Sequence, residues 1–105
     1  MSGHEIDIAC SDGTFTGYLA TPESGSGPGI IVIQEIFGVN QGIRQMCADY
    51  AAQGYVALAP DLFWRQEPGI QLTDQAEAEW ARAFELFQSF DLDKGVDDLN
   101  ATLEH

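Results

Sequence analysis

One carboxylate in this sequence, that of Glu35, lies at a position where α/β proteins often carry a functional side chain. The run GIIVI, residues 29–33, is apolar and rich in β-branched side chains, which is typical of a strand covered on both faces in a parallel sheet. Glu35 follows that run, and open α/β sheets form their ligand crevices at the carboxyl ends of strands. A partly desolvated carboxylate there would have a raised pKa and could exchange a proton with a nearby acid. Alternatively, Glu35 caps a neighbouring helix or turn, or points to water.

The other reactive side chains have weaker support. The chain has no G-x-S-x-G or G-x-C-x-G elbow that would present a nucleophile. Cys47 falls on the apolar stripe of a predicted helix, which favours a packing role. Asp61 could be catalytic, although an Asp that follows Pro60 at a strand end more often ties down a turn. Trp64 and Trp80 could line an aromatic pocket or fill the core.

Composition narrows the class of protein and its partners. With 105 residues, of which 45% are hydrophobic, the chain is one domain or less. Seventeen acidic against four basic residues give a net charge of -13, which argues against nucleic acid and anionic lipid as partners. Neither a membrane-length apolar run nor a signal peptide is apparent, so we expect a cytoplasmic protein. The wide spacing of its histidines and cysteines predicts no metal site or disulfide, and no cofactor is expected.

The elements that would position Glu35 follow from hydrophobic periodicity. Residues 4–21 read as two strands of an antiparallel hairpin, and residues 23–29 as a flexible connection. Between the strand at 29–33 and a second buried strand at 55–59, a helix capped by Asn40 completes a βαβ unit. The expected buried stripe of that helix is Ile43, Met46, Cys47, Tyr50 and Ala51.

Two more helices are predicted after an irregular stretch at residues 62–72. The first begins at about Thr73, with Asp74 and Glu77 at capping-box spacing. Its expected buried stripe is Ala76, Trp80, Ala83, Phe84 and Phe87. The second begins at about Leu92, and the residues expected to face inward are Leu92, Val96, Leu99 and Leu103. The acids of both helices are expected to form a solvated surface. The fold class is therefore α/β, with an antiparallel hairpin, parallel βαβ strands and flanking helices.

Three stretches carry a resemblance to a known family. QEIFGVN at residues 34–40, the pattern I-R-x-M-C-A-D-x-A-A-x-G-Y-V-A-L-A-P-D-L at 43–62, and FELFQSFDLDKGVDDLNATL at 84–103 closely resemble the N-terminal part of the dienelactone hydrolase family. The resemblance covers nearly all of the chain after the first hairpin. It implies the N-terminal half of an α/β-hydrolase fold, spanning residues 1–105, and a small ester or lactone as substrate.

The resemblance also implies a role for Glu35. The matching glutamate of the family contacts a nucleophilic thiol and helps to deprotonate it, and the backbone N–H of Ile36 would supply half of an oxyanion hole. The family arginine that binds the substrate carboxylate falls at Trp80, while Arg82 lies on a different helix face, which puts recognition of an anionic lactone in doubt. The expected substrate-binding residues are Phe37, Trp64, Trp80 and Arg82.

The family's nucleophile, Asp and His lie C-terminal to everything in this sequence. The chain is thus expected to be the front portion of a hydrolase in which Glu35 activates a nucleophile located elsewhere. The rival hypothesis is a non-catalytic α/β module that acts by self-association or partner binding; catalysis completed across a dimer is a third. Because the 29–33 strand would be left with an open edge, we expect a homodimer through that edge or through uncovered helix faces.

Overall fold

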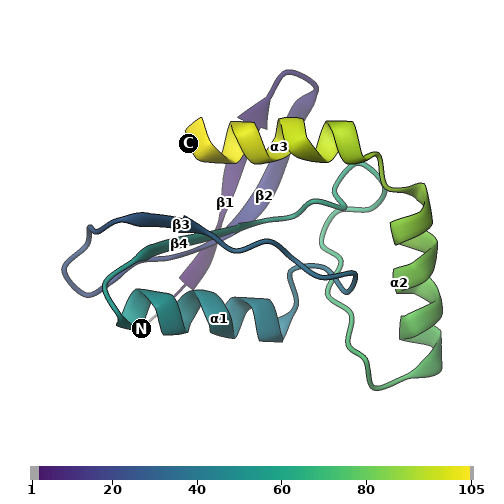
Figure 1. Ribbon diagram of the computed structural model, residues 1–105, viewed down its shortest axis with the longest axis horizontal. Helices are drawn as coiled ribbons and strands as arrows, with labels where there is room; N and C mark the ends of the chain where they lie inside the picture. Colours follow the sequence, from purple (N-terminus) through teal and green to yellow (C-terminus); the bar gives the residue numbers. More distant parts are fainter. Residues whose placement is uncertain (1–2, 105) are drawn as a thin grey trace.

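Four strands form one mixed sheet in the computed structural model, which describes residues 3–104. The sheet order is β1-β2-β4-β3, with α1 on one face and α3 on the other, and α2 stands beyond the end of the sheet (Figure 1). No helix in this described range is long and apolar enough to cross a membrane. The elements are β1 (Gly3–Cys10), β2 (Gly13–Ala20), β3 (Gly29–Ile31), α1 (Gln41–Ala52), β4 (Val56–Pro60), α2 (Glu77–Ser89) and α3 (Leu92–Glu104).

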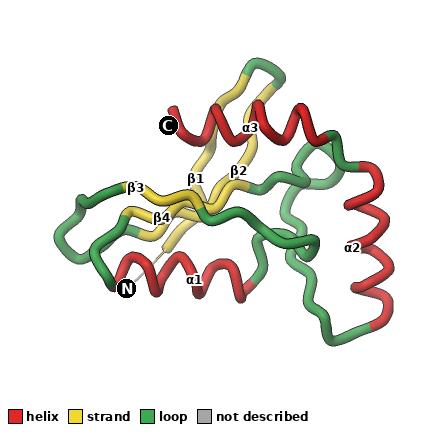
Figure 2. The backbone as a smooth tube through the Cα atoms, viewed as in Figure 1, coloured by secondary structure: helices red, strands yellow, loops and turns green. Residues whose placement is uncertain are grey.

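The predicted α/β class is confirmed. Strands β1 and β2 form the antiparallel hairpin, in which the buried side chains of Ile8 and Phe15 lie opposite each other. Strand β2 then pairs antiparallel with β4, and β3 pairs parallel with β4 on its other side. Long loops connect β3 and β4 to the helices that follow them (Figure 2). The hairpin therefore extends the sheet on one side of β4, and the parallel pair leaves β3 at the edge.

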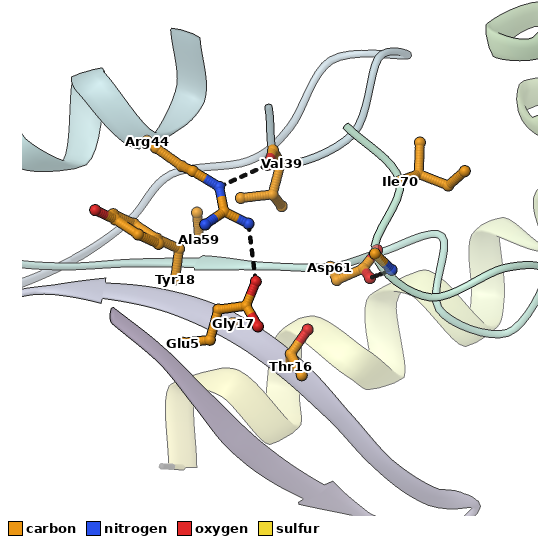
Figure 3. A pocket seen from close by; sticks show the side chains of 10 residues that line it. Glu5, Thr16, Gly17, Tyr18, Val39, Arg44, Ala59, Asp61 and Ile70 are labelled. Carbon is orange, nitrogen blue, oxygen red and sulfur yellow. Dashed lines mark hydrogen bonds and ion pairs between the residues drawn. The ribbon is translucent and has the colours of Figure 1, made fainter. Parts of the chain in front are cut away.

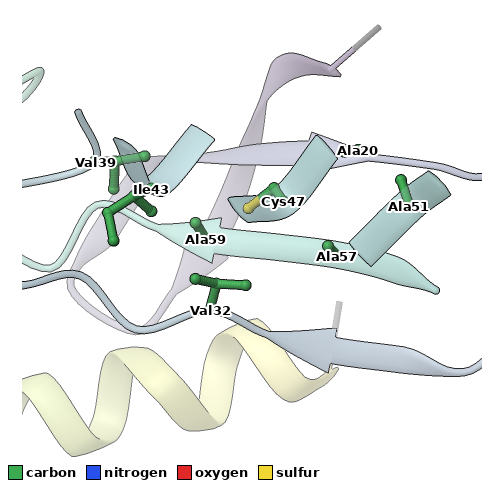
Figure 4. Close-up of a cluster of buried hydrophobic side chains, with 8 residues drawn as sticks. All are labelled: Ala20, Val32, Val39, Ile43, Cys47, Ala51, Ala57 and Ala59. Atoms are coloured by element: carbon green, nitrogen blue, oxygen red, sulfur yellow. The ribbon is translucent and has the colours of Figure 1, made fainter. Parts of the chain in front are cut away.

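The βαβ unit encloses the main core. Asn40 caps α1 as predicted, because its side-chain oxygen accepts the Ile43 N–H at 3.2 Å. Small residues on β2 and β4 allow the helix to approach the sheet closely, and Figure 4 shows Cys47 seated between them. The buried cluster consists of Ala20, Val32, Val39, Ile43, Cys47, Ala51, Ala57 and Ala59. Full burial of each larger aliphatic side chain contributes about 1.5–3 kcal/mol.

Two parts of this unit are less buried than predicted. Strand β3 ends at Ile31, although the Val32 N–H still bonds the Leu58 carbonyl at 3.0 Å. Ile33 is 58% exposed, so the expectation of a 29–33 strand covered on both faces is wrong at its end. Met46, expected on the buried stripe of α1, is also exposed. No element of residues 3–104 covers the side of β3 on which these side chains lie.

Helix α2 begins later than predicted, at Glu77 instead of about Thr73. The preceding backbone is held elsewhere, because the Leu72 N–H bonds the Phe37 carbonyl at 2.7 Å and the Asn40 amide donates to the Leu72 carbonyl at 2.6 Å. Thr73 instead donates to the Glu79 carboxylate through its N–H at 3.0 Å and its hydroxyl at 2.7 Å. The expected Asp74–Glu77 capping box is therefore wrong.

The buried face of α2 is narrower than predicted. Ala83 is buried as expected, and Leu86 is buried beside it against Phe63 and Ile70. The remaining members of the predicted stripe are exposed: Ala76, Trp80, Phe84 and Phe87. Since α2 stands beyond the sheet end, only one side of its apolar surface meets the rest of the described chain (Figure 1).

Helix α3 turns a neighbouring face to the sheet, not the one predicted. Leu92 is 70% exposed and Leu103 is 71% exposed, and Val96 is exposed as well. The fully buried positions are instead Asp98 and, one turn later, Thr102. The expectation of an inward-facing stripe is wrong for Leu92, Val96 and Leu103, whereas Leu99 is half-buried.

A buried ion pair explains this orientation. The Asp98 carboxylate is 0% exposed and accepts bonds from Trp64 Nε1 at 2.8 Å, Arg65 Nη2 at 2.9 Å and Arg65 Nε at 3.2 Å. Arg65 also reaches Asp12 in the β1–β2 turn at 2.6 Å, and the Trp64 ring stacks on Phe15 at 5.3 Å. The bond to Asp98 is the main cause that raises the pKa of Arg65. The prediction of a wholly solvated acidic surface is therefore wrong for Asp98.

Replacing Asp98 with alanine should lower the free energy of unfolding by about 3 kcal/mol, because removal of one partner leaves a buried ion pair uncompensated. Urea titration followed by tryptophan fluorescence measures this loss. The matched control is Asp97→Ala, whose side chain is exposed, with an expected change within about 0.5 kcal/mol. Equal effects of the two substitutions would show that the buried pair does not hold α3.

Candidate functional site

A tight turn places Glu35 just beyond β3. Residues Glu35 to Gly38 form a reversal in which the Gly38 N–H donates to the Glu35 carbonyl at 3.2 Å. Gly38 has a φ of +83°, and a side chain there would overlap the Ile70 carbonyl oxygen. The Phe37 carbonyl accepts the Leu72 N–H on the same side. Glycine is therefore required at position 38, both for the backbone conformation and for the close approach of residues 70–72.

Gln34 joins the ends of the two parallel strands. Its side-chain oxygen accepts the Leu62 N–H, just after β4, at 2.8 Å, and its amide donates to the Glu35 carbonyl at 3.2 Å. The backbone of Glu35 is therefore held from both strand ends. Sequence reasoning did not assign Gln34 a role, and its only signal was its place before Glu35 in the QEIFG run.

The Glu35 side chain itself is open. It is exposed, and no hydrogen bond from residues 3–104 reaches its carboxylate. The expectation of a partly desolvated carboxylate is thus wrong for this chain, because no described element covers the outer side of β3. A held backbone with a free carboxylate can still accept a proton from a group placed above it.

Two hollows meet at Glu35. Hollow A, of about 240 Å³, lies between the β4 end, α2 and α3, and its lining includes Ile33, Glu35, Ile36, Phe63, Phe87 and Val96. Hollow B, of about 550 Å³, lies beside the start of α1, and its lining includes Ile33, Glu35, Phe37, Asn40, Met46 and Asp74. A small molecule in either hollow would lie within reach of the Glu35 carboxylate.

The backbone N–H of Ile36 is available as a donor. Ile36 is the second residue of the Glu35–Gly38 turn, where the amide takes no part in the turn's own hydrogen bond. Within residues 3–104 it has no acceptor. Ile36 lines hollow A, and its N–H belongs to the residue next to Glu35, an arrangement that suits stabilisation of a developing oxyanion.

Phe37 and Trp80 are brought together beside this turn. Their rings meet edge to face at 5.0 Å, and Trp80 stacks on Phe84 at 5.8 Å. The Trp80 indole N–H donates to the Asp74 carbonyl at 2.9 Å, which fixes its ring. Trp80 packs on Phe37, which lines hollow B, but it lines neither hollow itself, so its expected contact with substrate stays a prediction.

Trp64 and Arg82 are placed elsewhere. Trp64 packs against the second core cluster, with Ile8, Phe15 and Leu58, and lines neither hollow. Arg82 forms ion pairs with Glu67 and Glu85, and these bonds raise its pKa. Their expected substrate contacts therefore remain predictions, and the described residues offer no geometry for them.

Asp61 acts as a turn residue here. Its buried carboxylate accepts the Phe63 N–H at 3.2 Å and the Gly69 N–H at 2.8 Å, so it organises the loop after β4. Burial raises its pKa, an effect that these two backbone bonds oppose. The structural alternative that sequence reasoning favoured for Asp61 is confirmed.

Arg44 connects the segment that follows the Glu35–Gly38 turn to strand β1, a role that the sequence analysis did not predict. Figure 3 shows its guanidinium between the Val39 carbonyl and Glu5, at 3.0 Å from each, and it lies over the Tyr18 ring at 4.7 Å. The surrounding cavity, of about 10 Å³, has room for about one water molecule. Only the helical placement of Arg44, on the same turn as Ile43, could have suggested this.

Cys47 is a packing residue, as predicted. Its thiol is fully buried, and desolvation raises its pKa to about 11, despite the opposing effect of Arg44. At neutral pH it is a thiol, and a thiolate is the nucleophilic form. No group of His, Cys, Asp and Glu side chains within residues 3–104 could hold a metal ion.

This chain is similar in sequence and in structure to known proteins. The model of the dienelactone hydrolase family matches residues 15–105. The chain belongs to the dienelactone hydrolase family. It is 43% identical over 103 residues to a carboxymethylenebutenolidase of Pseudomonas sp. strain P51, covering 98% of this chain and 43% of that protein. The Glu35 turn thus lies within the part that the family model matches.

Two further similarities agree. A protein of Azospirillum brasilense assigned as a carboxymethylenebutenolidase is 56% identical over 87 residues, covering 82% of this chain and 38% of that protein. The crystal structure of a Klebsiella pneumoniae protein assigned as a dienelactone hydrolase superposes with a TM-score of 0.78 at 31% identity, covering 96% of this chain and 41% of that one. The chain therefore spans about two fifths of the length of these relatives.

Gly38→Ala tests the constraint on the turn. The control is Gly69→Ala, since Gly69 has nearly the same φ of +80° but open space where a side chain would lie. Backbone strain alone should cost about 1 kcal/mol at position 69, and the overlap with Ile70 should add about 2 kcal/mol at position 38. Urea unfolding measures both losses. Equal losses would mean that the turn is free to move away from residues 70–72.

Proposed function

We propose that this chain supplies one wall of the active site of an enzyme that hydrolyses a small ester or lactone. The observation that carries the proposal is the Glu35 corner, where a held backbone presents a free carboxylate between two hollows, next to the donor N–H of Ile36. Family membership supports the reaction class, and the carboxymethylenebutenolidases named above suggest it.

In this mechanism Glu35 activates a nucleophile that is not among these 105 residues. The thiol or hydroxyl of that nucleophile transfers its proton to the Glu35 carboxylate and attacks the carbonyl carbon of the substrate. The Ile36 N–H stabilises the oxyanion of the tetrahedral intermediate. When the ester C–O bond breaks, the leaving oxygen takes the proton that Glu35 had accepted, and water later hydrolyses the acyl-nucleophile bond, which yields the acid and restores the protonated nucleophile. The chemistry needs no cofactor.

A reducing, cytoplasmic location fits this proposal. Cys10 and Cys47 are both free, and a reactive thiol elsewhere in the enzyme would also require reducing conditions. Small-molecule esters and lactones remain the proposed partners, and the acidity of the chain gives no reason to add nucleic acid or membrane.

The second candidate function is self-association without catalysis. It is favoured by the open edge of β3 and by the exposed side chains of Leu92, Val96 and Leu103 on α3. Together with the exposed end of β3, these side chains form apolar surface of the kind that marks interfaces. A homodimer through the β3 edge or through the α3 face is the form we propose for the isolated chain.

Glu35→Gln tests the catalytic proposal. The assay is hydrolysis of p-nitrophenyl acetate by a hybrid, in which this chain is joined to the part of the Pseudomonas protein that follows the matched region. Loss of the general base should lower kcat by about 10²-fold or more. Glu23→Gln, in the exposed loop before β3, is the matched control and should leave kcat unchanged.

The isolated 105-residue chain is assayed beside the hybrid over a range of concentrations. Turnover that depends on Glu35 and rises with dimer population would mean that two copies complete the site. Unchanged kcat in the Glu35→Gln hybrid would remove Glu35 from the mechanism.

Sedimentation velocity tests the dimer. We expect the weight-average sedimentation coefficient to rise with loading concentration, and we expect Val96→Asp to abolish that rise if the α3 face is the interface. Asn100→Asp adds the same charge at an exposed polar position of α3 and controls for repulsion between acidic chains. A chain that stays monomeric at millimolar concentration contradicts the proposal. A rise that Val96→Asp leaves unchanged assigns the interface to the β3 edge.

A further inference from the structure

The carboxamide of Gln34 bonds backbone groups at both of its ends. Its oxygen accepts the Leu62 N–H at 2.8 Å, and its nitrogen donates to the Glu35 carbonyl at 3.2 Å. The amide has one orientation that satisfies both bonds, because Leu62 offers a donor and Glu35 an acceptor. Gln34 is half-buried, and it lines hollow A together with Ile36.

The oxygen end of this carboxamide is bonded to a well-held part of the chain. Leu62 is buried and comes directly after Asp61. The Asp61 carboxylate holds the following loop, because it accepts the Phe63 N–H at 3.2 Å and the Gly69 N–H at 2.8 Å. The carboxamide of Gln34 is therefore fixed relative to the end of β4, and its nitrogen meets the Glu35 carbonyl from that position.

The Glu35 carbonyl belongs to the same peptide unit as the Ile36 N–H. This peptide bond is trans and planar, so its C=O and N–H point in opposite directions. The carbonyl accepts two donors, the Gln34 carboxamide and the Gly38 N–H, each at 3.2 Å. Whatever fixes the direction of this carbonyl also fixes the direction of the Ile36 N–H.

The second donor on the Glu35 carbonyl matters for two reasons. The Gly38 bond alone lies at the upper end of the normal hydrogen-bond range, so it leaves the peptide plane free to tilt. In addition, a carbonyl that accepts hydrogen bonds polarises its peptide unit, which makes the N–H of that unit a stronger donor. The Gln34 carboxamide thus both orients and strengthens the Ile36 N–H.

We propose that Gln34 is a positioning residue, which orients the Ile36 N–H toward the oxyanion of the reacting ester. This inference rests on the proposed hydrolase function, because the Ile36 N–H is the oxyanion donor of that mechanism. Gln34 acts through the Glu35–Ile36 peptide unit and not by contact with a reacting atom. Since the oxyanion develops only in the transition state, loss of Gln34 should lower kcat and leave KM nearly unchanged.

The first experiment measures the direction of the Ile36 N–H bond in the isolated chain by NMR residual dipolar couplings. Gln34→Met removes donor and acceptor at nearly the same side-chain length, and it should turn this bond by more than about 20°, the tolerance of a catalytic group. The matched control is Gln66→Met. Gln66 is also half-buried and donates to the Leu86 carbonyl at 2.6 Å, but it lines neither hollow. An unchanged bond direction in Gln34→Met, or an equal turn in both variants, overturns the proposal.

The second experiment measures hydrolysis of p-nitrophenyl acetate by the hybrid enzyme. Removal of an oxyanion donor costs about 10²–10³ in kcat, so a misdirected donor in Gln34→Met should lower kcat about 10-fold or more. KM should stay within about twofold of its original value. Gln66→Met should change neither constant. A raised KM with unchanged kcat, or equal losses of kcat in both variants, contradicts a positioning role.

Gln34→Glu separates the two ends of the carboxamide. A carboxylate keeps the acceptor for the Leu62 N–H but cannot donate to the Glu35 carbonyl. We expect its urea midpoint to lie closer to that of the original chain than the midpoint of Gln34→Met does, while kcat falls as far as in Gln34→Met. The added charge makes Glu35 harder to ionise, so kcat is taken from the plateau of the pH profile. Full kcat in Gln34→Glu would show that the bond to Leu62 suffices and would overturn the proposal.

The same hybrid distinguishes this inference from the proposed function. A lower kcat in Gln34→Met with unchanged kcat in Glu35→Gln would remove the proposed role of Glu35 and leave the positioning role of Gln34 standing. A lower kcat in Glu35→Gln with unchanged kcat in Gln34→Met would support the hydrolase and overturn the positioning role.

Discussion

Burial of the Asp98 carboxylate determines much of this structure. A charge taken out of water needs partners, and Trp64 and Arg65 supply them from the loop after β4. That requirement orients α3 so that Asp98 and Thr102 meet the sheet while Leu92 and Leu103 face outward. The same contacts hold the β1–β2 turn through Asp12. One buried ion pair therefore connects the hairpin, the site loop and the last helix.

The Glu35 corner is built mainly from backbone. Gly38 allows the turn to press against residue 70, and the Gln34 carboxamide spans the ends of β3 and β4. Arg44 and Asp61 support the adjoining loops through carbonyl and N–H groups. These hydrogen bonds are made by main-chain groups and by the Gln34 side chain. They fix the backbone of Glu35 and leave its carboxylate free to react.

The chain spends its few cations on structure. Arg65, Arg44 and Arg82 each form an ion pair with a carboxylate distant in sequence. In a chain with a large excess of acidic residues, these pairs connect segments that would otherwise repel each other. None of the four basic residues lines hollow A or hollow B.

The sequence by itself determined the hairpin, the βαβ unit, the cap at Asn40, the position of Glu35 and the family, because periodicity, capping and motifs act between near neighbours. Only the tertiary structure decided where α2 begins, which faces of α2 and α3 are covered, and that Asp98 is buried. Those outcomes depend on partners far along the chain, such as Arg65, which lies 33 residues from Asp98. A helical stripe records which side chains are apolar, whereas the burial of a face depends on what the rest of the chain places against it.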